Sequence, residues 1–242
     1  MSDFPYKRVL LKVSGEALAG ISGFGVDIDS VNRICADIAE VYAKGIEIGI
    51  VVGGGNIFRG SQVVAENYLL CERSTVDSMG MLSTVINALA LDLALRKINV
   101  PTVILSSIFM PQVCEVFSCR NAVSYLSQGK VVIFSGGTGN AFLTTDSAAA
   151  LRASEIGADV ILKGTQVDGV YSADPRVHAS STRFDSLTYN QFIEKGLKVM
   201  DCASVVLARD CAIPIIVFSI HSPGGIWGGL SGIGRSTIIS GE

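Results

Sequence analysis

The chain has 242 residues, of which 49% are hydrophobic and only 17% are charged, and its formal net charge is −3 at pH 7. This length and this apolar content suit one domain with a large core, so we expect residues 1–242 to form a single domain. The slight negative charge argues against a nucleic-acid groove, which needs a basic stripe. Bound phosphate would have to be held by a few placed cations and by backbone N–H groups.

Apolar, β-branched runs alternate with helical segments along the chain. The run Arg8–Val13 predicts a strand, and the spacing of Val31, Ile34, Ile38 and Val41 predicts a helix that begins near Asp29 and ends near Lys44-Gly45. Further strands are predicted at Ile46–Val52, Thr102–Leu105, Val131–Ser135, Asp159–Lys163, Ile215–Ser219 and Thr237–Ile239. Alternation of this kind, without internal repeats, predicts an α/β fold with a mostly parallel central sheet.

The segment Met79–Leu95 is apolar nearly all round, which predicts a helix that is buried on several sides. A membrane span is the alternative, but Gly80, Asn87 and Asp92 fit poorly in lipid. We therefore expect the helix to pack between the sheet and a second subunit, and we expect no contact with a membrane. The first seven residues are short and polar and carry no secretion signal, so the expected location is the cytoplasm.

Cysteine and histidine offer little for a metal site. The six cysteines form no C-x-x-C pair, and the two histidines lie far apart in sequence. We therefore expect free thiols in a reducing compartment and no metal site built from the side chains of this chain.

Three glycine-bearing turns follow predicted strands: Ser14-Gly15, Gly53–Gly55 and Gly136–Asn140. In a parallel sheet, such turns gather at the carboxyl ends of the strands, where ligands bind. Glycine lets backbone N–H groups approach phosphate oxygens closely, because it has no Cβ. Three turns of this kind favour a phosphate-binding site over ordinary tight turns.

Three charged residues stand in otherwise apolar surroundings. Lys12 interrupts the first strand, Lys163 closes the strand before Gly164, and Asp146 is the only charge between Lys130 and Arg152. A charge in apolar sequence is costly unless it is paired, so a role is expected for each. Two lysines and an aspartate suit phosphoryl transfer, in which the protein mainly holds charge in place. The alternative is a structural ion pair. For Asp146 we also expect a role as N-cap of a helix at Ser147–Ile156, alongside catalysis.

The motifs of other nucleotide-binding classes are missing from the sequence. It has no G-x-x-x-x-G-K-[ST] and neither H-R-D nor D-F-G, so it is not a P-loop kinase or a protein kinase. The glycines at 53–55 lack the G-x-G-x-x-G spacing of a dinucleotide-binding turn.

Six segments in order along the chain resemble those of the bacterial uridylate kinases in the amino acid kinase family. They are Lys12–Leu18 (KVSGEAL), Gly53–Gly60 (GGGNIFRG), Asp77–Met81 (DSMGM), Gly137–Asp146 (GTGNAFLTTD), Lys163–Pro175 (KGTQVDGVYSADP) and Lys198–Asp201 (KVMD). The resemblance implies a three-layer α/β/α sandwich whose N-terminal part binds the acceptor and whose C-terminal part binds ATP with Mg²⁺. It further implies reversible transfer of the ATP γ-phosphoryl group to UMP, giving UDP and ADP, in de novo pyrimidine nucleotide synthesis, and a homohexamer.

The resemblance also assigns residues. The catalytic residues it implies are Lys12, Asp146 and Lys163. Those implied to bind ATP are Lys12, Val13, Ser14, Gly15, Gly55, Arg59, Thr165, Tyr171 and Asp174. Those implied to bind UMP are Gly54, Asp77, Thr138, Gly139, Asn140, Ala141, Phe142, Leu143, Thr144 and Thr145. An allosteric segment, in the place of the family's GTP-activation segment, is implied at Gly20, Ile21, Ser22, Gly23, Phe24 and Gly25.

The chain departs from the family pattern at Ser78, Ala141 and Gln166, and the loop before Asp77 is longer. Two other functions stay open at this point. One is a small-molecule kinase of the same fold that acts on a carbamate or a carboxylate. The other is a nucleotide-binding protein without catalysis, against which the two lysines and Asp146 argue, because binding alone does not need them.

Overall fold

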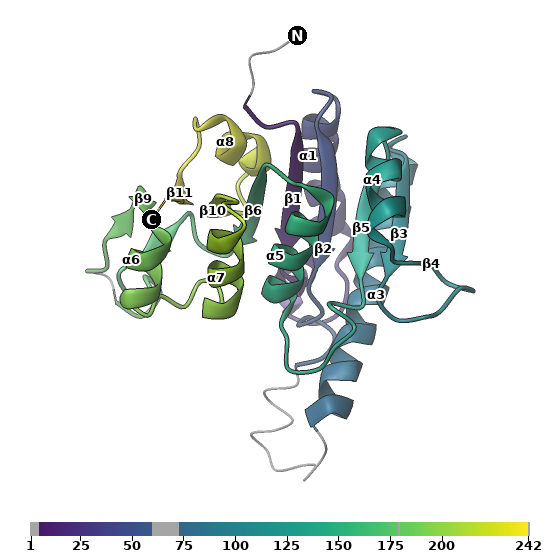
Figure 1. The fold of residues 1–242 in the computed structure, drawn as a ribbon, viewed down its shortest axis with the longest axis horizontal. Helices are drawn as coiled ribbons and strands as arrows, with labels where there is room; N and C mark the ends of the chain where they lie inside the picture. The colour runs from purple at the N-terminus through teal and green to yellow at the C-terminus, as the bar shows by residue number, and fades with distance from the viewer. Residues whose placement is uncertain (1–4, 60–72, 179, 242) are drawn as a thin grey trace.

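The computed structural model describes residues 5–59, 73–178 and 180–241, and its centre is a nine-stranded sheet (Figure 1). Gly60 and the longer loop before Asp77 lie outside these residues. The strand order is β4-β3-β5-β2-β1-β6-β10-β11-β9. The strands span β1 Arg8–Val13, β2 Glu47–Val52, β3 Thr102–Ser106, β4 Glu115–Val116, β5 Val131–Ser135, β6 Val160–Thr165, β9 Ser186–Leu187, β10 Ile215–Ser219 and β11 Ser236–Ile239. Among the described strands of this sheet, only the β10–β11 pairing is antiparallel, so the predicted mostly parallel sheet is confirmed.

Helices cover both faces of the sheet and complete three layers (Figure 1). On one face α1 (Ile28–Tyr42), α3 (Arg73–Lys97) and α8 (Gly225–Ser231) share a hydrophobic core with the strands. On the other face lie α4 (Cys119–Ser127), α5 (Thr145–Ile156), α6 (Tyr189–Glu194) and α7 (Cys202–Asp210). Two short 3₁₀ helices, η1 (Gly15–Leu18) and η2 (Gly20–Ser22), follow β1, and a separate ribbon pairs β7 (Val170–Tyr171) with β8 (Arg183–Phe184).

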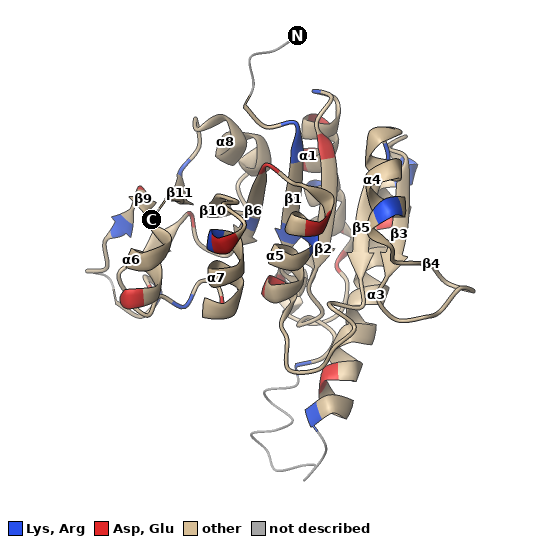
Figure 2. Ribbon diagram, viewed as in Figure 1, with Lys and Arg blue, Asp and Glu red and all other residues tan. Residues whose placement is uncertain are grey.

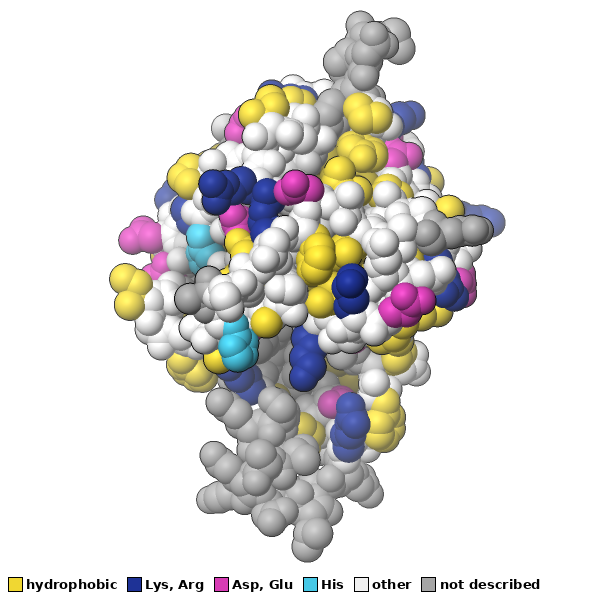
Figure 3. Space-filling view, turned by 90° about the vertical axis from the view of Figure 1, so that its left-hand side faces the viewer, with side chains coloured by type: hydrophobic (Ala, Val, Ile, Leu, Met, Phe, Trp, Pro, Cys, Tyr) yellow, Lys and Arg dark blue, Asp and Glu magenta, His cyan; other side chains and the backbone are white. Residues whose placement is uncertain are grey.

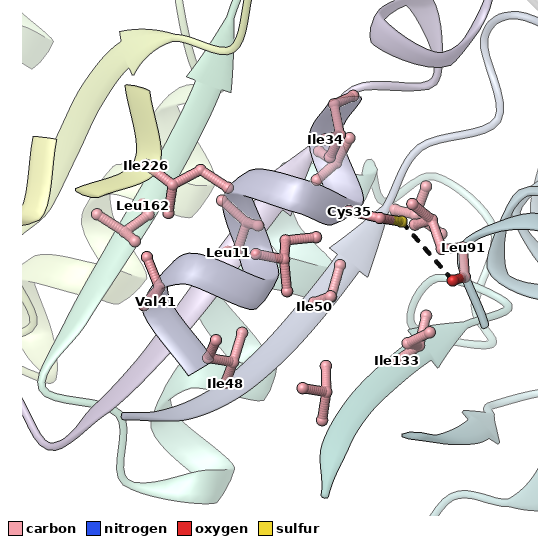
Figure 4. Close-up of a cluster of buried hydrophobic side chains, with 14 of the residues drawn as sticks. Leu11, Ile34, Cys35, Val41, Ile48, Ile50, Leu91, Ile133, Leu162 and Ile226 are labelled. Atoms are coloured by element: carbon pink, nitrogen blue, oxygen red, sulfur yellow. Dashed lines mark hydrogen bonds between the residues drawn. The ribbon is translucent and has the colours of Figure 1, made fainter. Parts of the chain in front are cut away.

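The helix α1 shows how the sequence builds one of these layers. Asp27 caps it, because its carboxylate accepts a hydrogen bond from the Ser30 N–H at 2.8 Å. The apolar residues at 3.6-residue spacing then face the sheet and are buried, as predicted. Figure 4 shows Cys35 on this helix directed at α3, where its Sγ lies 3.8 Å from the carbonyl oxygen of Leu91.

The predicted strands are all present, with bounds within two residues of those expected. The helix expected at Ser147–Ile156 begins earlier, at Thr145. The strands β4, β7, β8 and β9 and the helices α4, α6, α7 and α8 were not predicted, because such short elements carry little periodicity.

The helix α3 is longer than predicted, and the single chain covers only one side of it. Asn87, Ala88, Leu91 and Leu95 are buried against the sheet. A second apolar stripe is 39–67% exposed and consists of Met79, Leu82, Ile86, Leu89 and Leu93. The expected burial of the helix between the sheet and a second subunit is thus met on the sheet side, and burial of the other side stays a prediction. By length and composition α3 could cross a membrane, but half of its most apolar stretch is buried inside the protein, as in a core helix.

A buried pair of amides joins α3 to the turn after β2. The amide nitrogen of Asn56 donates to Asn87 Oδ1 at 3.0 Å, and the amide nitrogen of Asn87 donates to Asn56 Oδ1 at 2.7 Å. The second hydrogens are also used, by the carbonyl oxygens of Gly25 at 2.6 Å and Gly53 at 2.7 Å. The pair thus connects three segments through side chains that are at most 1% exposed.

Replacing Asn87 with alanine should lower the free energy of unfolding by about 2–4 kcal/mol, because the Asn56 amide and the Gly53 carbonyl would lose partners in a buried site. Chemical denaturation followed by circular dichroism measures this change. The exposed Asn121 on α4 provides the control, and Asn121→Ala should change stability by no more than about 0.5 kcal/mol. Equal effects of the two substitutions would contradict the role given to the pair.

Candidate active site

Two lysines lie side by side at the centre of the sheet. Lys12 on β1 and Lys163 on β6 are direct partners in the parallel pairing of these strands. Side chains alternate along a strand, so each lysine shares a face with the residue two positions earlier, Leu10 or Ile161. Both of those residues belong to the core that contains α5, so both lysines are directed at that helix. They are nearly buried, at 8% and 4% exposure.

Asp146, in the first turn of α5, lies between the two lysines. Its Oδ1 is 2.9 Å from Lys12 Nζ and 2.5 Å from Lys163 Nζ. Burial disfavours the charged carboxylate, but the two ammonium groups outweigh this effect and lower the pKa of Asp146 to about 2. Two cations and one anion leave a net positive charge, which suits an anionic ligand.

The surroundings of Lys163 disfavour its charged form and lower its pKa. Burial is the largest cause that lowers its pKa, and the charge of Lys12 lowers it further, whereas Asp146 raises it, so that the pKa lies at about 8 instead of 10.5. The charge of Lys163 at neutral pH therefore depends on the carboxylate beside it.

The prediction that Asp146 caps its helix is wrong. Thr144 is the N-cap of α5, and its hydroxyl accepts from the N–H groups of Asp146 and Ser147 at 3.0 and 3.2 Å. Since Thr144 meets the orphan N–H groups, the carboxylate of Asp146 is left to bind the lysines.

Asp201 is a site residue whose role the sequence analysis missed. Its Oδ2 accepts a hydrogen bond from the Thr144 hydroxyl, and its Oδ1 accepts from the Ser204 N–H at 2.8 Å, which caps α7. Asp201 thereby joins the N-termini of α5 and α7. The only signal for it was its place at the end of the K-V-M-D segment.

A pocket of about 570 Å³ opens beside the lysines on the C-terminal side of the sheet, and Lys12 and Lys163 line it. Of the residues predicted to bind ATP, Ser14, Thr165, Tyr171 and Asp174 also line it. The hydroxyl of Ser14 is buried and has no hydrogen-bond partner among the described residues, so it is free to meet a ligand. Figure 3 views the molecule from the side of β9 and α6 and shows basic side chains spread over this face.

The other residues predicted to bind ATP do not line this pocket. Val13 is buried in β1. Gly15 packs on the turn after β2, since a Cβ on it would lie 2.7 Å from the Gly55 nitrogen. Arg59 lies at the margin, where its Nη2 is 2.8 Å from an oxygen of Glu16, a residue that does line the pocket.

A second, more open pocket of about 500 Å³ adjoins the first, and the two share Lys12 and the segment 196–198 as lining. Asp146, Asp201 and, from the predicted UMP residues, Thr144 and Thr145 line it. Two molecules bound in these pockets could therefore meet next to Lys12 and the segment 196–198.

The remaining residues predicted to bind UMP lie outside these two pockets, near the N-terminal turns of α3. Asp77 is joined to their loop, since its Oδ2 accepts from the Phe142 N–H at 2.7 Å. Gly54 packs so closely on α3 that a Cβ would lie 2.7 Å from the Gly80 carbonyl oxygen. The others, Thr138, Gly139, Asn140, Ala141 and Leu143, are exposed or half-buried in the loop before α5.

The segment Gly20–Gly25, predicted to be allosteric, lies next to the glycine-rich turn after β2 and lines neither pocket. Ile21 and Phe24 are exposed. Gly25 exchanges two hydrogen bonds with Asn56, so the segment contacts the turn after β2 directly.

Figure 2 shows acidic and basic positions scattered over the elements of the fold. Within the described residues, no three histidine, cysteine, aspartate or glutamate side chains gather as a metal site would require.

Comparisons with known proteins agree with this geometry. The sequence model of the amino acid kinase family matches residues 7–219. A uridylate kinase of Rhizobium meliloti (strain 1021) is 61% identical over 235 residues, which cover 97% of each protein. A uridylate kinase of Agrobacterium fabrum is 60% identical over 240 residues, covering 99% of this chain and 98% of the relative.

Solved structures resemble the fold over nearly its whole length. The crystal structure of UMP kinase from Ureaplasma parvum matches with a TM-score of 0.91 and 35% identity, covering 97% of this chain and 99% of that one. The UMP kinase from Bacillus anthracis matches with a TM-score of 0.91 and 37% identity, covering 98% of this chain and 96% of that one.

Replacing Asp146 with asparagine should lower the pKa of Lys163 well below 8, because the substitution removes the charge that keeps the lysine protonated. The Cε chemical shift of ¹³C-labelled lysine, followed by NMR through a pH titration, reports this pKa. Asp201 raises the pKa of Lys163 only by a weaker charge effect. Asp201→Asn should therefore lower the pKa of Lys163 less than Asp146→Asn does. An unchanged Lys163 titration in a folded Asp146→Asn protein would contradict the assigned electrostatics.

Proposed function

The chain belongs to the amino acid kinase family, and from this premise we propose that it is a uridylate kinase, which transfers the γ-phosphoryl group of ATP reversibly to UMP and gives UDP and ADP. The observation that carries the proposal is the pair of lysines held by Asp146 beside two adjoining pockets. Uridylate kinases with about 60% identity over nearly the whole chain support the choice of acceptor, and with it a role in pyrimidine nucleotide synthesis.

The geometry suggests how the residues act. ATP would occupy the larger pocket and direct its γ-phosphoryl group at Lys12 and Lys163, with the acceptor phosphate next to Lys12 and the start of α5. In phosphoryl transfer the protein contributes mainly position and charge. At about 4 Å and an effective dielectric constant near 20, one ammonium group is worth about 4 kcal/mol to a phosphoryl oxygen. Asp146 would hold both cations apart and aimed at the reacting group.

We propose that Mg²⁺ enters with ATP. Mg²⁺ usually keeps several waters and binds one or two carboxylates together with substrate phosphates, so the lack of a carboxylate cluster among the described residues fits a metal carried by the nucleotide. When bound, the ion would neutralise charge on the phosphates. Asp146 and Asp201 are the carboxylates that line the second pocket, and both are already engaged by donors from this chain.

The same proposal divides the chain by task. The segments up to the start of α5, with Asp77 and the loop 138–145, would bind UMP, and the segments from β6 onward would bind ATP. A response of Gly20–Gly25 to an effector belongs to the proposal too, because this segment contacts the turn after β2. We place the protein in the cytoplasm.

An acceptor panel tests the function. A coupled assay with ATP and UMP, CMP, dUMP or N-acetylglutamate should show turnover with UMP far above that with the others. Lys12→Met is the matched catalytic control and should lower kcat by on the order of 100- to 1000-fold in a folded protein, because one ammonium group is lost from the transition state. Preferred turnover of a carboxylate would favour the alternative small-molecule kinase, and nucleotide binding without any turnover would favour the non-catalytic reading.

We also propose that the protein is a homo-oligomer and, because the family resemblance implies it, a hexamer. The exposed stripe of α3 would form one of its interfaces. The stripe repeats at three- and four-residue spacing, as do helices that pack against a partner helix. Leaving so much apolar surface in water is unusual for a monomer.

Replacing Leu93 with glutamate should split the oligomer into smaller species, because the substitution places a charge at the most exposed position of the stripe, which is 67% exposed. Light scattering at micromolar concentration measures the mass. Ile233, which is 84% exposed and lies outside the stripe, provides the control substitution Ile233→Glu. A native protein that is already monomeric would overturn the proposed assembly.

A further inference from the structure

Arg152 is a buried charge that the proposed chemistry does not use. It lies on α5, and its side chain is only 4% exposed. Its partners are not the catalytic lysines or Asp146. The guanidinium carbon lies 3.6 Å from the ring centre of Phe117, one nitrogen pairs with Glu155, and the other donates to the Ser107 hydroxyl at 2.8 Å.

Ser107 links Arg152 to the loop that precedes α5. Its hydroxyl accepts from Arg152 and donates to the carbonyl oxygen of Gly137 at 2.9 Å. Its backbone N–H also binds the carbonyl oxygen of Ser135 at 3.1 Å. A Cβ on Gly139 would lie 3.2 Å from the Ser107 side chain, so the loop is packed directly on Ser107.

The loop Gly136–Asn140 needs these contacts because its glycines allow many backbone conformations. Gly136, Gly137 and Gly139 all have positive φ angles, of 73°, 56° and 80°. Glycine reaches these angles without strain but also leaves them easily. On the other side, the hydroxyl of Thr84 on α3 accepts from the Gly136 N–H at 2.8 Å. Ser107 and Thr84 therefore clamp the loop from two elements.

A purely structural role explains Arg152 less well. Its Nε is buried and has no hydrogen-bond partner among the described residues. A buried guanidinium with an unmet donor adds little to stability, and an apolar side chain in its place is often as stable or more so. What the arginine adds here is a fixed direction for one hydroxyl, because its planar group is held by a ring, a carboxylate and Ser107 at once.

We propose that Arg152 is a positioning residue for the acceptor nucleotide, acting through Ser107 to fix the loop Gly136–Asn140. The proposal rests on the proposed function, in which the segment that begins at Thr138 binds UMP. None of the residues that line the larger pocket lies in this loop or in β3, so ATP binding should be independent of the contact. Arg152 and Asp146 share α5, but of the two only Asp146 contacts Lys12 and Lys163.

Steady-state kinetics test the proposal with three variants. Arg152→Met and Ser107→Ala should each raise the KM for UMP by about 3- to 30-fold, which is the range for losing a hydrogen bond to a charged or polar group. The value of kcat and the KM for ATP should change by less than about threefold. Arg152→Lys keeps the charge but loses the planar fork, and it should recover only part of the UMP affinity.

A double-mutant cycle and a matched control complete the test. The KM of Arg152→Met combined with Ser107→Ala should rise less than the product of the two single effects, because both substitutions break one contact. Arg120→Met, at an exposed arginine on α4, should leave both KM values unchanged. Equal rises in the two KM values, or an unchanged KM for UMP in folded Ser107→Ala, would overturn the proposal.

Hydrogen exchange gives a readout that does not depend on the substrate. The amides of residues 136–140 should exchange faster in Arg152→Met and Ser107→Ala, whereas those of β6 and β10 should not change. Should Arg152→Met fail to fold, Ser107→Ala alone decides the matter. If the native protein does not phosphorylate UMP, the proposed function fails, but faster exchange in the loop still supports the positioning contact and unchanged exchange overturns it.

Discussion

The ion triad of Lys12, Asp146 and Lys163 is the constraint on which the rest of the structure depends. Parallel pairing places the two lysines as direct neighbours, and two ammonium groups that contact the same carboxylate oxygen repel each other by about 3–4 kcal/mol at an effective dielectric constant near 20. One carboxylate oxygen that contacts both cations offsets this repulsion. The charge that remains is positive and nearly buried, which is a poor arrangement for stability alone and a good one for holding a phosphoryl group.

Placing Asp146 requires that the N-terminus of its helix and the distance of the helix from the sheet are both fixed. Thr144 caps α5 and is itself bound by Asp201 at the start of α7. The alanines of α5 pack on Leu10 and Ile161, the residues that precede the two lysines on the same face. The small side chains let the helix approach the sheet closely, and this close approach brings the carboxylate within reach of both cations.

The sequence predicts those features whose signal lies within one segment of the chain, and it misses those that depend on contacts between distant segments. The central strands were predicted because buried parallel strands are continuous apolar runs, and Lys12 and Lys163 stood out because they interrupt such runs. Asp146 was found for the same reason, but its role as a cap was wrong, because the choice between Thr144 and Asp146 depends on where the helix starts in space. Asp201 and Arg152 could not be assigned, since their partners are 57 and 45 residues away in sequence.

The loop before α5 is where the two proposed binding regions meet in one stretch of chain. It leaves β5 through glycines that have little conformational preference of their own, and it ends at the cap that aims Asp146. Ser107 holds its first part, the carboxylate of Asp77 holds the Phe142 N–H in its middle, and Asp201 holds Thr144 at its end. An acceptor that alters the middle of this loop must act on a segment fixed at both ends. These three contacts connect the residues proposed to bind the acceptor to the start of α5, next to Asp146.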